Sequence, residues 1–436
     1  MAKKNGGQPP KKPAEQRLSA SVDDLLTAAL ERGDESLETG RFIVTYKENA
    51  IDEAVRSLNT QGFRVADARE FKDQAVTLDA VGDAEAVVFP EIGAAVVGGG
   101  ALNQRGLSAQ SEIPLDSPIE AIEPEYFVFA SADPNSLYLR GFVRAAEAIA
   151  QDLRAPSEEE ELEAEVDPAV VGATWGLIRC KVPPSRRSGA GIRVTVLDTG
   201  MDLGHPDFAG RAFVTQSFVG QPVQDLHSHG THCIGTACGP KAPVGSTPRY
   251  GVAFRAPIFV GKVLTNSGSG TTASVLAGMN WAIANRCPVI SMSLGGPGPV
   301  QAAYTAAGTS ALSRGCLIIA AAGNDAAATG APANSPTIMS VASLDRTLSP
   351  SSFSNFGKVE IAAPGRDVFS SVPRPTRYGT KSGTSMATPH VAGCAALWAE
   401  TSPALRGMAL WNRLQTTAKP LPFSPVRVGK GIVQAP

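Results

Sequence analysis

Short apolar runs and longer helical patterns alternate along the second half of the chain. The runs at 192–197 and 317–322 are rich in Val, Ile, Leu and Ala, as expected of strands buried on both faces. Helical patterns cover 272–285 and 300–314. Because this alternation is typical of an α/β architecture, residues 173–436 are predicted to form a mostly parallel sheet with helices on both faces.

The first 172 residues follow a different pattern. Residues 1–38 are predicted to comprise a disordered Lys/Pro/Gly/Gln-rich tail and a short helix over 22–32. Residues 39–130 predict a small α+β domain with a helix at 51–58 and strands at 42–46, 63–65, 75–78, 94–97 and 119–129. Residues 131–172 are predicted to be a linker with an amphipathic helix over 137–153 and an acidic run at 158–161.

Composition narrows the classes of function. The chain has 436 residues, of which 43% are hydrophobic and 18% charged, and its net charge is −2. This balance gives no indication of binding to nucleic acid or to a membrane surface. No apolar run is long enough for a transmembrane helix, and no apolar core follows the basic residues at the start. The sequence therefore predicts a cytoplasmic protein or export by a non-standard route.

A serine among small residues is the most distinctive chemical feature. Ser385 lies in the stretch GTSMATPHVAG at 383–393. A serine hydroxyl is a poor nucleophile until a base takes its proton, so a histidine and an acid that orients it are expected. Upstream, His229 lies in the sequence SHGTH, and Asp198 ends a β-branched run and precedes Thr-Gly.

These three motifs, in the order Asp, His, Ser, resemble those of the subtilisin-like serine proteases (subtilases). The resemblance implies a subtilisin-like three-layer sandwich over 173–436 and a serine endopeptidase that cleaves peptide bonds through an acyl-enzyme. Ser385 would be the nucleophile and His229 the general base and acid. Asp198 would hold the imidazole in its working tautomer.

An acyl-transfer site also needs donors for the oxyanion. Residues 317–325 are typical of a buried strand that ends in Gly-Asn. Asn324 matches the oxyanion-hole asparagine of the subtilases, and its carboxamide would act together with the backbone N–H of Ser385. Taken alone, an asparagine at this point is also typical of a turn.

Two segments resemble the substrate-binding strands of the family. A protease that accepts many sequences holds the main chain of its substrate through extended segments, and glycines permit close approach. Taken alone, the second of these segments, 267–270, is also typical of a loop. The residues implied in binding, with the last two lining the primary specificity pocket, are Ser293, Leu294, Gly295, Gly268, Ala322 and Gly323.

The N-terminal α+β domain resembles the subtilase propeptide, which is a ferredoxin-like inhibitor domain. The resemblance is carried by the apolar and acidic texture of 119–129. It implies a chain that processes itself from a precursor, with polypeptides as substrates and its own N-terminal domain as an intramolecular inhibitor. The alternative is an accessory domain that never touches the site.

No cofactor is required for this chemistry, but calcium is a structural ion in many subtilases. Asp207 matches one calcium-binding acid, although the loop 238–245 lacks the usual asparagines and carries a lysine. A second candidate site, which resembles one in proteinase K, would use Asp345 and the backbone carbonyl of Pro332. The six cysteines include no C-x-x-C pair, which argues against zinc and leaves both free thiols and disulfides open.

Two other classes of function fit the same motifs. One is a catalytically inactive scaffold that binds peptides, which labelling of Ser385 by a fluorophosphonate probe would exclude. The other is an acyl transferase or peptide cyclase on the same fold. Mass spectrometry of the peptide products, cyclic or cleaved, would separate it from a hydrolase.

Overall fold

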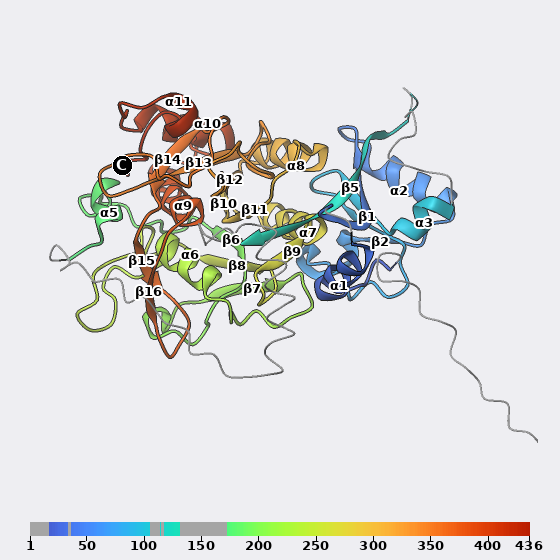
Figure 1. Cartoon of the computed structure of the whole chain (residues 1–436), viewed down its shortest axis with the longest axis horizontal. Coiled ribbons are helices and arrows are strands. Elements are labelled where there is room, and N and C mark those ends of the chain that lie inside the picture. The colour runs from blue at the N-terminus through green and yellow to red at the C-terminus, as the bar shows by residue number, and fades with distance from the viewer. Residues whose placement is uncertain (1–16, 34–35, 105–113, 115–116, 131–171) are drawn as a thin grey trace, which may run out of the picture.

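The computed structural model describes residues 17–33, 36–104, 114, 117–130 and 172–436 (Figure 1). The predicted linker helix, the acidic run and most of the predicted N-terminal tail lie outside these residues. Helix α1 covers Val22–Arg32, as the sequence predicts. Its first turn is capped by Ser21, whose hydroxyl accepts a hydrogen bond from the Asp24 N–H at 3.0 Å.

The larger part of the protein is built on a seven-stranded parallel sheet in the order β14-β13-β12-β10-β6-β8-β7. The strands are β6 (Val194–Asp198), β7 (Phe213–Ser217), β8 (Ile258–Lys262), β10 (Val289–Met292), β12 (Leu317–Ala321), β13 (Met339–Leu344) and β14 (Ile361–Pro364). The predicted parallel sheet is therefore confirmed.

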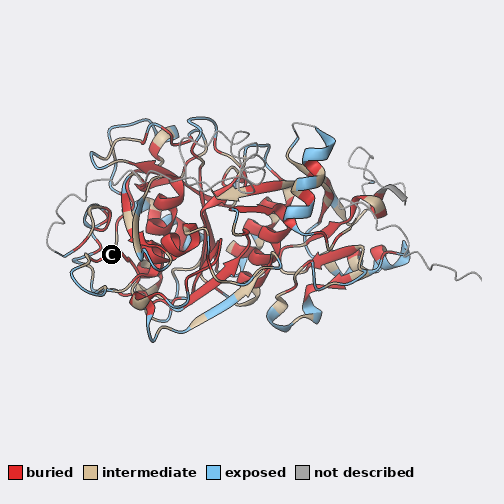
Figure 2. Ribbon diagram, turned by 60° about the horizontal axis from the view of Figure 1, so that its bottom comes forward, coloured by how far each residue is buried: buried red, intermediate tan, exposed pale blue. Residues whose placement is uncertain are grey.

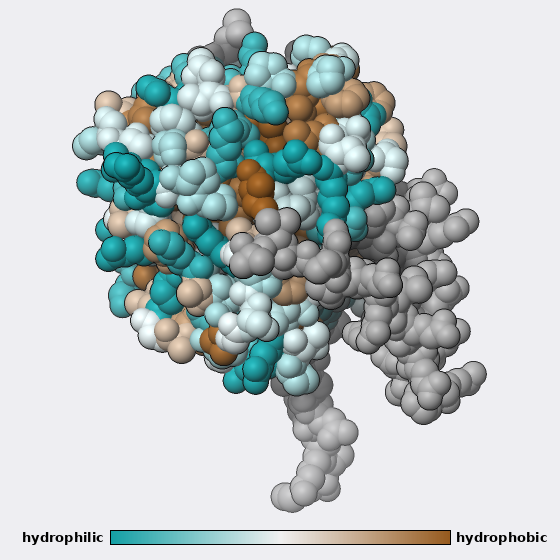
Figure 3. Space-filling model, turned by 90° about the vertical axis from the view of Figure 1, so that its left-hand side faces the viewer, coloured by the Kyte–Doolittle hydropathy of each residue, from teal (hydrophilic) through white to brown (hydrophobic). Residues whose placement is uncertain are grey.

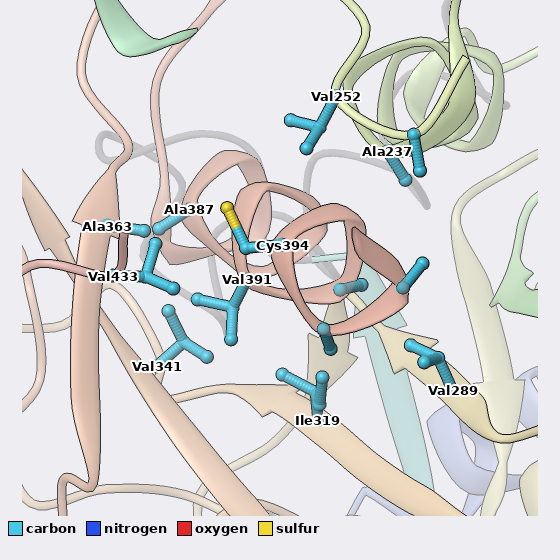
Figure 4. Close-up of a cluster of buried hydrophobic side chains, with 14 of the residues drawn as sticks. Ala237, Val252, Val289, Ile319, Val341, Ala363, Ala387, Val391, Cys394 and Val433 are labelled. Atoms are coloured by element: carbon cyan, nitrogen blue, oxygen red, sulfur yellow. The ribbon is translucent and has the colours of Figure 1, made fainter. Parts of the chain in front are cut away.

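Helices cover both faces of this sheet. One face carries α6 (His229–Cys238) and α9 (Thr384–Thr401), and the other carries α7 (Thr272–Ala284) and α8 (Ala302–Ser313). Along β12, Leu317 and Ile319 pack with the first pair of helices, whereas Ile318 and Ala320 pack with the second. Successive strand residues point to opposite faces, so a strand covered on both sides must be apolar throughout. Figure 4 shows side chains of α9 packed against those of the sheet.

Smaller elements complete this part. They are α5 (Trp175–Arg179), the hairpin of β15 (Val368–Ser371) and β16 (Tyr378–Lys381), α10 (Gly407–Thr417), α11 (Pro425–Val428), and the short strands β9 (Ser269–Thr271) and β11 (Leu294–Gly295). All six cysteines are buried and free.

The N-terminal part has its own sheet and apolar core. Its elements are β1 (Glu38–Tyr46), α2 (Ile51–Thr60), β2 (Val65–Asp67), β3 (Ala86–Phe89), β4 (Ala94–Val97), α3 (Gly99–Gln104) and β5 (Ile119–Ala130). The strands lie in the order β5-β1-β4-β3-β2. Residues of α2 and α3 pack on one face of this sheet.

One predicted strand of the N-terminal part is wrong. Residues 75–78 are irregular, and the strand next to β4 is instead β3, which the sequence reading missed. Val76 and Leu78 are buried in the core cluster that also contains residues of α7. Positive φ angles at Asp73 and Gln74 turn the chain just before them. The apolar pattern at 75–78 thus reflects burial in a core cluster shared by the two parts rather than membership of a sheet.

The two parts share one sheet, because β5 continues beyond β1 and pairs antiparallel with both β9 and β11 of the larger part. Figure 2 shows buried residues extending through the sheets and the central helices, with most exposed residues in outer loops and helix turns. This shared sheet brings the end of the N-terminal part to the candidate site.

Among the described residues, no helix is both long and apolar enough to cross a membrane. On the face shown in Figure 3, apolar side chains gather in small groups between polar ones, which is ordinary for a protein surface.

Candidate active site

Asp198 and His229 are brought together by the end of a strand and the start of a helix. Asp198 is the last residue of β6, and His229 is the first residue of α6. His229 Nδ1 lies 2.7 Å from Asp198 Oδ1, and both side chains are buried. With the Nδ1 proton donated to the carboxylate, His229 Nε2 carries the lone pair. This nitrogen is buried and has no hydrogen-bond partner, so it is available as a base.

Ser385 is held at the start of α9 by a consequence of Pro389. In a regular helix the Ser385 carbonyl would accept a hydrogen bond from residue 389, but proline has no N–H. That carbonyl instead accepts from Ser293 Oγ at 2.7 Å and from Cys233 Sγ at 3.6 Å. In return, Ser385 Oγ donates to the Ser293 carbonyl at 3.2 Å. Two hydrogen bonds thereby join the serine to the residue between β10 and β11.

Asn324 follows β12 and reaches the same helix start. Its Oδ1 accepts hydrogen bonds from the backbone N–H of Thr384 at 2.8 Å and from Thr384 Oγ1 at 2.9 Å. The Gly323 N–H also donates to Thr384 Oγ1, at 3.1 Å. Because both donors bind the oxygen, Nδ2 remains the donor atom of this carboxamide. The residue that orients it, Thr384, directly precedes Ser385.

The glycines of the predicted binding strands are needed for close packing. A Cβ on Gly295 would lie 2.5 Å from the Ala331 carbonyl oxygen, and one on Gly268 would lie 2.7 Å from His227 Nε2. Gly323 has a φ of +112°, and a Cβ there would meet Asn355 Nδ2 at 2.2 Å. Substitution of any of these glycines would force the surrounding atoms apart.

Both predicted binding strands are already paired with β5. Leu294 and Gly295 of β11 lie opposite Ala130 and Phe129. On the other side of β5, the Ala130 N–H donates to the Gly268 carbonyl at 2.8 Å. The C-terminal end of β5 therefore lies between the two strands. Its last residue, Ala130, lies opposite Leu294, which directly follows Ser293, the residue that bonds Ser385.

Two buried charged residues that the sequence reading missed support the segments that carry Asp198 and His229. Asp225 accepts hydrogen bonds from the backbone N–H groups of His227 at 2.9 Å, Ser228 at 3.0 Å and Thr231 at 2.9 Å. Asp225 lies three residues before the N-cap residue, Ser228, which makes no side-chain cap bond itself, so the usual N-cap pattern does not reveal this role. Lys262 donates to the Thr199 carbonyl and to an Asn266 side chain. Burial lowers the Lys262 pKa to about 8, although the nearby Asp225 and Asp198 oppose that shift.

The other histidines have structural partners or are packed near His229. His232 Nε2 bonds the Val368 carbonyl at 2.9 Å, His205 Nε2 the Arg377 carbonyl at 2.8 Å, and His390 Nδ1 the Met386 carbonyl at 2.9 Å. The centroid of the His227 ring lies 6.2 Å from that of His229, and burial, assisted by His229, lowers the pKa of His227 to about 4. His227 is thus neutral near pH 7 and lies beside His229.

The donor sets do not favour a metal at most of the candidate positions. Both oxygens of Asp207 are engaged: Oδ1 accepts from the Val244 N–H at 2.7 Å and the Tyr378 hydroxyl at 3.0 Å, and Oδ2 accepts from the Tyr250 hydroxyl at 2.6 Å. Calcium needs several oxygen ligands, whereas these neighbours are donors. Asp345 Oδ1 accepts three hydrogen bonds from nearby residues of its own turn, Thr347 N at 2.9 Å, Thr347 Oγ1 at 2.6 Å and Ser349 N at 3.0 Å.

A group of ligand-type side chains also occurs beside Ser385. Atoms of Asp198, His229 and Cys233 lie within 4.8 Å of one another. Asp198 and His229 already bond each other, and burial, together with Asp198, raises the pKa of the Cys233 thiol well above its usual value. A protonated thiol is a poor metal ligand, so this group is better suited to acid–base chemistry.

Comparisons with known proteins agree with this geometry. The model of the subtilase family matches residues 189–431. The alkaline protease of Alkalihalobacillus alcalophilus is 39% identical over 284 residues, which are 63% of this chain and 72% of the relative. Subtilisin Savinase of Lederbergia lenta is 39% identical over 270 residues, which are 60% of this chain and 96% of the relative. Among solved structures, a cold-adapted subtilisin-like serine proteinase matches with a TM-score of 0.52 and 35% identity, over 60% of this chain and 97% of that one.

Proposed function

Because the chain belongs to the subtilase family of serine endopeptidases, we propose that Asp198, His229 and Ser385 are its catalytic triad. The observation that carries this assignment is the buried pair of Asp198 and His229, in which His229 Nε2 has no hydrogen-bond partner. The pair lies at the C-terminal end of β6, and Ser385 lies in the first turn of α9. The family requires no cofactor for catalysis, and every step below uses side chains of this chain.

In the proposed reaction, Ser385 Oγ attacks the carbonyl carbon of the scissile bond while His229 Nε2 takes its proton. Asp198 stabilises the imidazolium that results. The tetrahedral intermediate then collapses to an acyl-enzyme, and His229 returns the proton to the leaving amine. Water, activated by the same imidazole, hydrolyses the ester and restores the serine.

Asn324 and the Ser385 N–H are proposed to hold the oxyanion. The contacts of Asn324 Oδ1 with Thr384 support this role, because they commit the oxygen and keep Nδ2 as a preorganised donor. Substrates are proposed to bind as an extended strand between Gly268 and the pair Leu294 and Gly295, with Ser293 fixing the nucleophile. Ala322 and Gly323 are assigned to the primary specificity pocket.

A direct test uses a fluorophosphonate probe followed by peptide mapping. Labelling of wild-type protein at Ser385, lost in Ser385→Ala, is expected together with linear cleavage products from casein. A wild-type chain that the probe does not label at Ser385 and that releases no products would favour a peptide-binding scaffold. Cyclic or ligated products in place of hydrolysis would favour an acyl transferase.

The proposal extends to the N-terminal part, residues 39–130, as an intramolecular inhibitor. Its support is the antiparallel pairing of β5 with both β9 and β11, which is how a product strand would bind. Being tethered raises the effective concentration of such a strand, so it occupies the cleft in preference to free peptides.

Two carboxylates of β5 strengthen this contact. Glu123 Oε2 accepts a hydrogen bond from the Ala302 N–H at 2.9 Å, and Glu125 Oε1 accepts one from the Ala273 N–H at 2.9 Å. These N–H groups lie in the first turns of α8 and α7, where a helix has unpaired donors and favours negative charge. Burial raises the Glu123 pKa, although its backbone hydrogen bonds act in the opposite direction.

The inhibitor proposal predicts a self-cleavage site at or after the end of β5, within residues 130–172. The purified full-length chain should release an N-terminal fragment, and sequencing of the new N-terminus should locate the cut in this range. The Ser385→Ala chain should stay intact. A wild-type chain that is fully active while uncut would contradict the proposal and leave the accessory-domain alternative.

For calcium, the Asp345 site with the Pro332 carbonyl is the one position that we propose for testing. Asp345 Oδ1 already accepts three hydrogen bonds, so a metal there would use Oδ2, and the Pro332 carbonyl accepts one hydrogen bond, from the Ser335 N–H at 3.1 Å. If calcium binds there, EDTA should lower the melting temperature of the wild-type chain and leave that of Asp345→Ala unchanged.

A further inference from the structure

Helix α1 packs its apolar side against the end of β5. Leu25 is 0% exposed and Ala29 is 5% exposed, and both belong to a cluster with Ala20 and Phe127. Leu26 and Phe129 pack against the edge of this cluster. Figure 1 shows α1 next to the strands β1 and β9, on the side of the N-terminal part that meets the larger part. The helix therefore touches the very residues that lie in the candidate cleft.

Helix α1 covers the side of β5 that carries Phe127 and Phe129, which is opposite to the side that carries Val128. Side chains alternate along a strand, and Val128 packs into the core cluster that contains Leu264 and Leu294. Phe127 and Phe129 must then point to the opposite side. A strand bound to β9 and β11 alone would leave these two aromatic side chains to solvent, whereas Phe127 is 2% exposed here.

Polar contacts fix the ends of α1 to the same region. The guanidinium of Arg41 in β1 donates to the Leu18 carbonyl at 2.9 Å and to Thr271 Oγ1 of β9 at 3.3 Å. At the other end of the helix, Arg32 donates to the Glu38 carbonyl at 2.7 Å. Leu18 itself is 3% exposed. One arginine thus joins the segment before α1 to a substrate-binding strand of the larger part.

We propose that residues 18–32 form a clasp that binds the outward face of β5 and slows its departure from the cleft. The clasp rests on the proposed function, because it acts on the strand proposed to inhibit the enzyme. The clasp binds the apolar pair Phe127 and Phe129 and belongs to the same chain as β5. A separate peptide substrate that occupies the same strands has no such clasp. The N-terminal part should consequently leave the cleft more slowly than a peptide with the sequence of β5.

The test compares two leucines of the same helix in the full-length chain. Leu25→Asp places a charge in the buried contact, whereas Leu30→Asp is the matched control because Leu30 is 43% exposed. The measured quantity is the lag before peptidase activity develops at a fixed protein concentration. Losing one buried leucine should shorten the lag by about 10- to 100-fold in Leu25→Asp. The control should behave like wild type, and a chain that begins at residue 34 should match Leu25→Asp.

Hydrogen exchange in the Ser385→Ala background separates a clasp from general support of the N-terminal fold. In Leu25→Asp, faster exchange is expected at residues 127–130 and 269–271, with β3 and β4 unchanged. Equal lags in the two leucine variants, or an equal rise of exchange throughout β3 and β4, would overturn the clasp. A wild-type chain without any lag would instead refute the inhibitor proposal, while the exchange data would still report whether α1 protects β5.

Discussion

Replacing Glu125 by alanine should weaken both the N-terminal part and its hold on the larger part, because this buried carboxylate bonds to residues of both. Glu125 is 0% exposed and accepts hydrogen bonds from Arg41 Nε at 2.5 Å, Arg41 Nη2 at 3.0 Å, Thr39 Oγ1 at 2.5 Å and the Ala273 N–H at 2.9 Å. The Arg41 side chain is 1% exposed, so Glu125→Ala leaves a guanidinium buried without its counter-charge.

The expected size follows from that geometry. Removing one partner of a buried ion pair costs about 3–5 kcal/mol, which is a factor of roughly 10² to 10³ or more in an equilibrium constant. Urea unfolding of the N-terminal part in the Ser385→Ala chain should show this loss, and the lag before activity should shorten in the active chain. Replacing both partners, as Arg41→Met with Glu125→Leu, should recover most of the stability, since no unpaired charge remains.

The matched control is an exposed ion pair of the same domain. Arg64 and Asp83 lie 3.3 Å apart with side chains 54% and 88% exposed, so Asp83→Ala should change stability by less than about 0.5 kcal/mol. If Glu125→Ala matched this control, or if the double variant were as unstable as the single one, the reasoning from desolvation would be refuted.

Three further outcomes are expected. Asn324→Ala should lower kcat by about 10²- to 10³-fold with little change in KM in steady-state assays, which is the known effect of removing the oxyanion-hole asparagine of subtilisin. A change in KM alone would show that Asn324 does not act in the oxyanion hole. Tyr250→Phe should lower the free energy of unfolding by about 1–3 kcal/mol, and the melting temperature with it, through loss of its bond to Asp207, whether or not EDTA is present. An effect of EDTA that vanished in this variant would instead indicate calcium at Asp207. Burial lowers the His390 pKa from 6.5 to about 4, so the folded state holds this ring neutral, and its contribution to stability is complete above pH 6.5 and lost as the pH falls towards 4. His390→Gln should flatten that slope in thermal melts of the inactive chain, and an unchanged slope would assign it to other groups.

The pattern of residues predicted the catalytic part well because its strands are buried on both faces. A run such as 317–321 must be apolar at every position, and the helices between such runs keep a 3.6-residue period, so both signals are local. In the N-terminal part the same reasoning mistook 75–78 for a strand. Val76 and Leu78 are buried in a core cluster that joins strands of the N-terminal part to α7, two hundred residues away along the chain, and no local signal distinguishes that burial from a strand.

The sequence by itself pointed to the residues that we propose as the triad, since Asp198, His229 and Ser385 stand in motifs whose order and neighbours are readable without coordinates. Only the tertiary structure decided how they are supported. Ser293 meets the Ser385 carbonyl because Pro389 leaves it without a helical partner, and the seven-stranded sheet brings these distant residues within hydrogen-bond distance. Likewise, β5 lies between β9 and β11 because the edges of these strands have backbone N–H and C=O groups that can pair with an extended segment. Which segment that is depends on contacts such as that of Glu125 with α7, which join positions too far apart for any sequence pattern to link.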